Sequence, residues 1–474
     1  GRVPGDLTGR LAAKLPAHMV PARVLPVDAL PLTVNGKLDR EALTERAGTA
    51  DAGAEHDVTV VAQDTALTAL AAIFTDTLPG TAVDGDCDFF RAGGDSILAI
   101  TVVNRARALG LAISPRDVFL LRTPRALAAH LATGTPRTAV PAPAVHEDGP
   151  LTPTPIILRQ RELGGSLARF AQARAVTAPE GTGLADARRA ANAVVAAHPA
   201  LRLRLRVEHG VWALRTEPAR AVTVVRSDAP DATAAADEAA GRLDPETGDV
   251  IAFTWLEASR TLVVAVHHLA VDAVSWLVLL HDIAIALRGN PLAPPTTSYA
   301  EYARALADAS AHPADDGLGH WITTLQAPPL LPAVRAPRDT TVVLPPEVGD
   351  LVTRTAPAAL GIGLTELLCG ALRTALTRVQ PAPTDLAVDL ERHGRDPVLP
   401  HHDYTRTVGW FTSIAPVRLT AHTDPVEAAR EVAARRPDER AHLAYGRLRH
   451  LDPQTAPLLD AHPQVLFNYL GRSG

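Results

Sequence analysis

The sequence predicts a chain of several domains, in which a small all-α bundle precedes a large α/β body. At 474 residues the chain is too long to fold around a single hydrophobic core. Residues 60–133 show the apolar spacing of four helices, whereas the sequence from Leu151 onward alternates strand and helix signals. Two stretches rich in small, polar and proline residues, 44–57 and 132–150, are typical of linkers and separate these parts.

The composition excludes several classes of protein. A net charge of -6 and a pI near 6.3 give no reason to expect a nucleic-acid partner. The two cysteines, Cys87 and Cys369, lie far apart, which favours neither a disulfide framework nor a metal site and indicates a cytoplasmic protein. The apolar stretch 261–280 holds two histidines and an aspartate in its middle, and residues 1–10 are not a signal peptide, so we expect no membrane segment.

Within the bundle, the most informative segment is Gly93-Gly94-Asp95-Ser96. We expect Asp64 to cap a first helix, and a second helix to occupy 96–109 with Ser96 as its N-cap. A short helix follows at 115–121, and Thr123-Pro124 opens the last one. A phosphodiester on the Ser96 hydroxyl would lie at the positive end of a helix dipole, although a serine at this place can also be only a cap.

Taken together, the segment DFFRAGGDSILAITVVNRARALGLAISPRDVF resembles the peptidyl carrier proteins of nonribosomal peptide synthetases. The resemblance implies a four-helix carrier domain at residues 58–133, followed by a linker at 134–150. It also implies a covalent 4'-phosphopantetheine cofactor on Ser96, attached by a phosphopantetheinyl transferase as a partner.

The first 45 residues are too short to enclose a substrate. Their segment NGKLDR resembles the end of a nonribosomal adenylation domain, in which the lysine that matches Lys37 contacts the acyl adenylate. A lysine exposed in an Asn-Gly turn is the plainer interpretation. We therefore expect residues 1–45 to be the C-terminal part of an adenylation domain and expect no amino-acid activation from this chain.

In the body, a strand-to-helix corner carries the candidate chemistry. Residues 201–207 and the returning VWALR predict a hairpin, 262–266 a central strand, and 274–287 a helix. His267, His268 and Asp272 lie between that strand and that helix, where α/β folds often place catalytic groups. Since strand side chains alternate, only one histidine can face a given cavity, and both could instead be hydrogen-bonded core residues.

The segment HHLAVDAVSW resembles the HHxxxDGxSW motif of condensation and epimerization domains, which are related to chloramphenicol acetyltransferase. This resemblance implies a two-lobed α/β body with lobes at 151–325 and 326–474. His268 matches the catalytic histidine of that family, whereas His267 and Asp272 match structural positions, the aspartate holding the loop by an ion pair.

Three further segments are similar to signatures of epimerization domains: DLERHGR at 389–395, RTVGWFTS at 406–413 and FNYLG at 467–471. The resemblance implies epimerization of the α-carbon of a carrier-bound L-aminoacyl or peptidyl thioester, an isomerase reaction of antibiotic and other secondary-metabolite synthesis. An upstream adenylation domain and a downstream condensation domain would then be partners.

This chemistry needs two titratable groups on opposite sides of the α-carbon, and His268 and Glu391 are the natural pair. Burial must raise the pKa of Glu391, while Arg392, which replaces a glycine of the signature, is expected to lower it. Asn468, Tyr469 or a backbone N–H near residue 269 could donate to the enolate oxygen. We expect no metal, and no pyridoxal cofactor because the body contains no lysine.

Two other functions fit the same residues. The body could be a condensation enzyme in which His268 assists amine attack on a thioester. It could also be a catalytically silent module that only docks the carrier.

Overall fold

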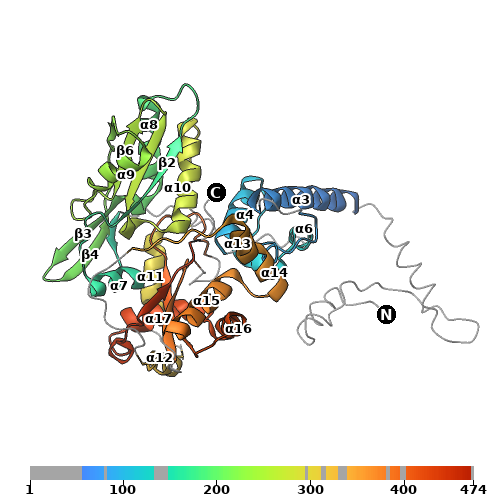
Figure 1. Cartoon of the computed structure of the whole chain (residues 1–474). Coiled ribbons are helices and arrows are strands. Elements are labelled where there is room, and N and C mark those ends of the chain that lie inside the picture. The colour runs from blue at the N-terminus through green and yellow to red at the C-terminus, as the bar shows by residue number, and fades with distance from the viewer. Residues whose placement is uncertain are drawn as a thin grey trace, which may run out of the picture.

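A computed structural model of the chain describes residues 56–78, 83–94, 96–132, 148–293, 297–310, 317–328, 339–379, 385–395 and 402–470. The predicted adenylation segment with Lys37 lies outside the described residues, as does most of the linker 134–150. Figure 1 shows the small helical bundle beside the larger body.

The predicted four-helix bundle is confirmed. Its helices are α3 (His56–Thr77), α4 (Ser96–Ala108), α5 (Pro115–Leu121) and α6 (Pro124–Ala132). They enclose a core that includes Leu70, Phe74, Phe89 and Val103. The two glycines before α4 adopt positions that a larger residue would not tolerate. Gly93 has a φ of 94°, and a Cβ on Gly94 would lie 2.4 Å from the Phe89 ring.

Two expected helix starts differ in the structure. Helix α3 begins at His56, so the prediction that Asp64 caps it is wrong; the Asp64 carbonyl instead accepts a bond from Thr68 within the helix. Residues 56–63 contain no glycine or proline, and nothing in their sequence stops the helix from extending toward the N-terminus. Helix α4 includes Ser96 as its first residue, and the cap position before it lies outside the described residues.

The first lobe of the body contains two sheets, with strand orders β2-β7-β6-β5 and β1-β4-β3. Their strands are β1 (Gly149–Leu151), β2 (Ala171–Thr177), β3 (Leu203–Glu208), β4 (Val211–Thr216), β5 (Val224–Arg226), β6 (Ile251–Leu256) and β7 (Thr261–His267). The predicted hairpin is β3-β4, and the predicted central strand is β7, which is buried along its whole length. The helices of this lobe are α7 (Pro155–Leu163), α8 (Leu184–Ala197), α9 (Ala232–Ala240), α10 (Ala273–Leu287) and α11 (Tyr299–Ser310). Short 3-10 helices, η2 (Pro199–Arg202) and η3 (His268–Ala270), complete it.

The second lobe is built on the sheet β10-β8-β9, in which β10 is parallel and β9 antiparallel to β8. The strands are β8 (Leu386–Arg392), β9 (Ser413–Leu419) and β10 (Val465–Phe467). The helices are α12 (Leu318–Leu325), α13 (Pro346–Asp350), α14 (Ala356–Leu360), α15 (Leu364–Val379), α16 (Pro425–Arg435) and α17 (Glu439–His450), with short helical turns η4 (Leu351–Thr355) and η5 (Ala456–Leu459). Helix α12 packs against β9 and α17, and therefore lies with this lobe.

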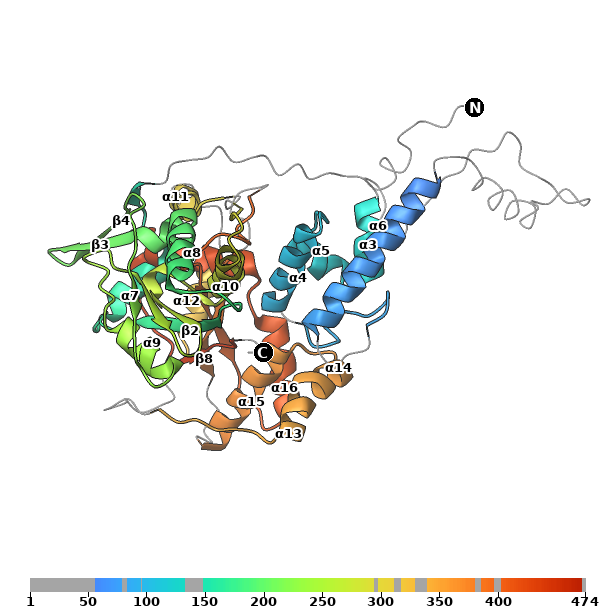
Figure 2. The same cartoon turned by 90° about the horizontal axis from the view of Figure 1, so that it is seen from above.

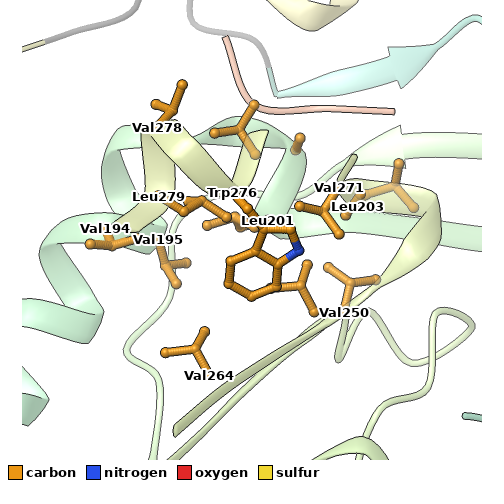
Figure 3. Packing of buried hydrophobic residues seen from close by; sticks show 14 of the residues in the cluster. Val194, Val195, Leu201, Leu203, Val250, Val264, Val271, Trp276, Val278 and Leu279 are labelled. Carbon is orange, nitrogen blue, oxygen red and sulfur yellow. The ribbon is translucent and has the colours of Figure 1, made fainter. Parts of the chain in front are cut away.

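The connection from β8 to β9 joins the two lobes. Its described residues 402–412 leave the second lobe, and Tyr404, Val408 and Trp410 enter the hydrophobic core of the first. The same core contains Trp276, which is 2% exposed and packs among Leu201, Val250 and Val271 (Figure 3). Since protein cores are close-packed, packing fixes the position of this part of the connection.

The bundle contacts the body through α4, which approaches α10 (Figures 1 and 2). Arg107 near the end of α4 donates to the Asp403 carboxylate and, at 2.8 Å, to the Thr405 hydroxyl. The bundle is thus held at the connection between β8 and β9. Within the described part of the chain, no helix has both the length and the apolarity needed to cross a bilayer.

Candidate active site

His268 lies where β7 ends and η3 begins, with its ring between two aromatic side chains. Phe170 stacks on it at a centroid distance of 4.9 Å, and Trp410 lies at 4.6 Å with a tilt of 44°. The ring atom Nε2 is 2.9 Å from the Nε2 atom of the Gln172 amide. Burial lowers the pKa of His268, so the ring is neutral at pH 7 and can accept a proton.

His267 points to the other side of β7 and is fully buried. Its Nδ1 accepts from the N–H of Leu269 at 3.3 Å, which leaves Nε2 to donate to the Leu167 carbonyl at 3.1 Å. Burial lowers its pKa to about 4. Both ring nitrogens are therefore engaged in fixing the turn, which fits an orienting role better than a catalytic one.

Asp272 is the N-cap of α10 and the centre of a buried network. Its Oδ1 accepts from the N–H of Ser275 at 2.7 Å and from Arg395 Nη2 at 2.8 Å, and its Oδ2 accepts from the N–H of Phe411 at 3.0 Å. The ion pair that the resemblance implied for this aspartate is thus present, with Arg395 as its cation. A capped helix end and a paired buried charge both favour a rigid corner behind His268.

Arg395 also makes hydrogen bonds to the connection between β8 and β9, which thereby becomes part of the same network. It donates to the carbonyls of Tyr404 and Thr407 at 2.8 and 2.6 Å, and its guanidinium lies 4.1 Å from the centroid of the Phe411 ring. Gly394 before it has a φ of 64°, and a Cβ there would lie 1.9 Å from the Phe411 carbonyl oxygen. The segments HHLAVD, ERHGR and RTVGWFTS are therefore parts of one folded unit.

A second buried network holds the same connection to α10. Asp282 is fully buried, accepts two bonds from Arg406 at 2.9 and 3.1 Å, and lies 2.9 Å from His198 Nε2. Trp410, whose ring covers His268, lies in the sequence between Arg406, which pairs with Asp282, and Phe411, whose N–H donates to Asp272. Its carbonyl accepts from the Tyr299 hydroxyl at 2.8 Å.

Glu391 lies near the end of β8, on the second lobe. Burial raises its pKa to about 7, the Arg159 guanidinium opposes that rise, and the Asp272 carboxylate adds to it. The expectation that Arg392 lowers the pKa of Glu391 is wrong: the pKa is raised, and neighbouring residues of a strand point to opposite faces. Arg392 instead approaches the Pro437 carbonyl.

Asp389 shares the Arg159 cation with Glu391. Arg159 donates to it at 3.1 Å, yet burial raises the pKa of Asp389 to about 6. Two carboxyl groups on one face of β8 thus titrate near neutral pH. Of the two, Glu391 is nearer to the end of the strand from which the chain turns toward Arg395 and the first lobe.

His268 and Glu391 belong to different lobes, and the charge of the Asp272 carboxylate acts on both. Burial lowers the pKa of His268 and raises that of Glu391; the negative charge of Asp272 opposes the first shift and adds to the second, so both groups lie within its electrostatic reach. Two hollows lie beside this region and share Arg159, Ile414 and His450, but neither has His268 or Glu391 in its wall. The structure therefore places the two groups around one carboxylate without defining a passage between them.

The FNYLG segment follows β10 along the edge of β8. Since Phe467 pairs in parallel register with Leu390, Asn468 continues beside Glu391 and not beside His268. Asn468 is exposed and Tyr469 is half-buried. Both stay candidates for contacts with a substrate near Glu391.

The start of α4 suits a phosphodiester. Ser96 is its first residue, its first turn contains no acidic side chain, and its basic residues Arg105 and Arg107 lie in the last turn. Free backbone N–H groups at a helix start stabilise an anion. The bound group would supply a flexible arm that ends in a thiol, on which a substrate is carried as a thioester.

Sequence reasoning missed three residues around the site. Gln172 and Arg159 lie in segments that carry no recognised motif, and Arg395 was part of a quoted signature without a role of its own. The polar positions Gln172 and Arg174 alternate with alanine in AQARAVT, but such alternation equally predicts a half-exposed strand.

Comparisons with known proteins agree with this arrangement. Residues 170–472 match the Condensation domain family, and residues 67–131 match the family of the phosphopantetheine attachment site. The chain is 32% identical over its whole length to a linear gramicidin synthase of Brevibacillus parabrevis, and 31% identical over 98% of its length to chondramide synthase cmdD of Chondromyces crocatus. It spans only 10% and 13% of those two proteins.

Among solved structures, the epimerization domain from the third module of tyrocidine synthetase B is similar to 68% of this chain over 82% of its own length. The TM-score is 0.56 and the sequence identity 21%. The X-domain from teicoplanin biosynthesis is similar over 70% of this chain and 77% of its own, with a TM-score of 0.52 and 24% identity. At such identities these similarities establish the fold, and with it the two-lobed body. The chain therefore belongs to the condensation-domain family and, with its phosphopantetheine attachment domain, is part of a nonribosomal peptide synthetase.

Proposed function

We propose that this chain epimerizes the α-carbon of an L-aminoacyl or peptidyl thioester carried on Ser96. The observation that carries the proposal is Glu391, a carboxyl group with a pKa of about 7 on the second lobe. A group with that pKa can both take and return a proton near neutral pH, which is what inversion of an α-carbon requires. A condensation reaction that relies on His268 alone has no evident use for it.

The reaction moves one proton off the α-carbon and one onto its opposite face. One of His268 and Glu391 removes the α-proton, and the electron pair of the broken C–H bond moves toward the thioester carbonyl. The other group, which must be in its protonated form, then delivers a proton from the other side. The cycle changes no oxidation state. At its end the group that began without a proton holds one and the other group has lost its proton, so exchange with solvent must restore both groups before the next turnover.

The wider setting follows from the carrier. An adenylation domain upstream would load the substrate, a phosphopantetheinyl transferase would install the arm on Ser96, and a condensation domain downstream would accept the D-isomer. We place this assembly in the cytoplasm, because a thiol-ended arm needs the reducing conditions that the low cysteine content also fits.

The test is solvent exchange at the α-carbon. The chain is loaded on Ser96 with an L-aminoacyl pantetheine group in deuterated water, the product is released, and both its deuterium content and its chirality are measured. We expect deuterium at the α-carbon and a mixture of L and D forms. We also expect the initial rate of conversion of the L to the D isomer to fall about a hundredfold or more in both His268→Ala and Glu391→Gln.

The control variant Glu180→Gln makes the same chemical change at an exposed turn and should keep the wild-type rate. No exchange in the wild type would refute the proposal. If carrier docking then persisted, the result would indicate the silent module; peptide formation with a second loaded carrier and unchanged chirality would indicate condensation.

A further inference from the structure

The orientation of the Gln172 amide can be assigned from its two partners. The indole Nε1 of Trp276 can only donate, and it lies 2.7 Å from Gln172 Oε1. The amide oxygen therefore faces Trp276, and the NH2 group faces His268 Nε2 at 2.9 Å. The reversed amide would place two donors against each other at the indole.

This orientation determines where the proton of neutral His268 lies. An amide NH2 group has no lone pair to offer, so His268 Nε2 must accept and cannot itself carry a hydrogen. The proton of the neutral ring then belongs on Nδ1. That atom is buried without a hydrogen-bond partner.

The two residues that set this orientation are themselves held firmly. Gln172 pairs with Val266 in the β2-β7 ladder, and side chains on a strand alternate, so residues 266 and 268 share the face toward which Gln172 points. Trp276 is 2% exposed in the core of the first lobe (Figure 3). The Gln172 amide therefore lies between a fixed donor, the Trp276 indole, and a fixed acceptor, His268 Nε2.

We propose that Gln172 is a positioning residue that keeps the proton of neutral His268 on Nδ1 and so leaves Nε2 as the ring atom with a lone pair. The amide NH2 occupies that lone pair in this structure, and Nε2 becomes the basic atom of the site when the substrate displaces the amide. The Gln172 amide affects the reaction only by orienting His268, and Trp276 affects it only by orienting that amide. The inference deepens the proposed function and rests on it for the role of His268 in catalysis. The assignment of the tautomer itself rests only on the geometry of the three side chains.

The direct test is nitrogen-15 NMR of the histidine rings in the full-length chain without substrate, at about pH 8, where the ring is neutral. The signals of His268 are those missing from His268→Ala. We expect a protonated, pyrrole-like Nδ1 and a pyridine-like Nε2 in the wild type. A proton on Nε2 in the wild type would overturn the proposal, and this spectrum decides even where a variant does not fold.

Gln172→Glu provides a variant of the same shape and opposite hydrogen-bonding polarity. A carboxylate can still accept from Trp276, but it also demands a hydrogen from His268, so we expect the proton to move to Nε2. The matched control is Gln160→Glu, the same change on α7, where the amide makes a solvent-accessible bond to the Gly164 carbonyl; its His268 signals should stay as in the wild type. An unchanged tautomer in folded Gln172→Glu would also overturn the proposal.

Kinetics then separate this inference from the proposed function. If both hold, conversion of the L to the D isomer falls about tenfold or more in Gln172→Glu and keeps its wild-type rate in Gln160→Glu. If the wild type shows the Nδ1 tautomer but exchanges no α-proton, the proposed function fails while the assignment of Gln172 stands. Conversion at the wild-type rate in Gln172→Glu with a shifted tautomer would show that the tautomer has no part in the reaction and would overturn the positioning role.

Discussion

Glu391 and Asp272 are carboxyl groups of one neighbourhood that have different hydrogen-bond partners. Asp272 accepts three hydrogen bonds, one of them from Arg395. Glu391 lies where water solvates it poorly, and its opposing cation, Arg159, donates its described hydrogen bond to Asp389. One group is thereby suited to hold the corner, and the other to exchange a proton.

The raised pKa of Glu391 predicts how stability depends on pH. In the folded chain its pKa is about 7, against 4.5 for the unperturbed group, so the unfolded state releases its proton first as the pH rises. The stabilising contribution is complete below pH 4.5, declines between 4.5 and 7, and is absent above pH 7. We expect Glu391→Gln to gain roughly 3 kcal/mol over the wild type across that interval in urea unfolding.

The control for this measurement is Glu180→Gln, whose difference from the wild type should not vary with pH. A constant difference between Glu391→Gln and the wild type from about pH 4 to pH 8 would show that Glu391 is not held as described.

At the scale of elements, the ion pair of Asp272 and Arg395 joins α10, the end of β8 and the connection to β9. Asp272→Asn leaves the Arg395 charge buried and unpaired, and we expect a loss of about 3 kcal/mol in the free energy of unfolding of the body. The double variant Asp272→Asn with Arg395→Gln removes both charges and should recover part of that loss. Differential scanning calorimetry of the two single variants and the double variant completes the cycle.

A loss in the double variant equal to the sum of the two single losses would mean that the residues do not interact. Arg418→Gln is a suitable control, because its ion pair with Asp385 is partly exposed and worth about 1 kcal/mol or less.

The sequence predicted the elements better than their connections. Strand β7 and helix α5 were predicted closely, because a continuous apolar run and a serine-proline start are local signals. The start of α3 was missed, because Asp64 is a good cap in isolation and the sequence before it contains no helix breaker. The expected effect of Arg392 was wrong because adjacency in sequence is not adjacency in space.

The site was predictable only as far as its motifs reach. Sequence patterns identified His268, Glu391 and Asp272 as candidates. Only the fold shows that the Asp272 carboxylate acts on both of the other two residues. Gln172, Arg159 and the cation for Asp272 could not be found from the sequence, since each acts across a distance of many residues through a single contact. No local pattern encodes such a contact.

At the scale of the whole molecule, the carrier bundle contacts the body at the connection between β8 and β9. Arg107 of α4 contacts Asp403 and Thr405, a few residues before Trp410, whose ring covers His268. Docking of the carrier and placement of Trp410 therefore depend on the same stretch of chain.

This arrangement predicts a charge-reversal experiment. Arg107→Asp places two carboxylates together, and we expect α-carbon exchange in the loaded chain to fall severalfold, since a partly exposed pair contributes only about 1 kcal/mol. Adding Asp403→Arg restores opposite charges and should restore the rate. Arg105→Asp, at a position of the same helix that is paired instead with Asp76, serves as the control.

Restoration of the rate by high salt in Arg107→Asp alone would agree with this account, because salt screens repulsion between exposed charges. A double variant no better than Arg107→Asp would show that the pair does not hold the carrier.

The central claim is that His268 and Glu391 approach one α-carbon from its two faces. It is tested most directly by loading His268→Ala and Glu391→Gln separately with L- and with D-aminoacyl groups and measuring deuterium uptake from each isomer in deuterated water. The account predicts opposite patterns: one variant keeps exchange only from the L-isomer and the other only from the D-isomer. Loss of exchange from the same isomer in both variants, with exchange from the other isomer kept in both, would contradict it.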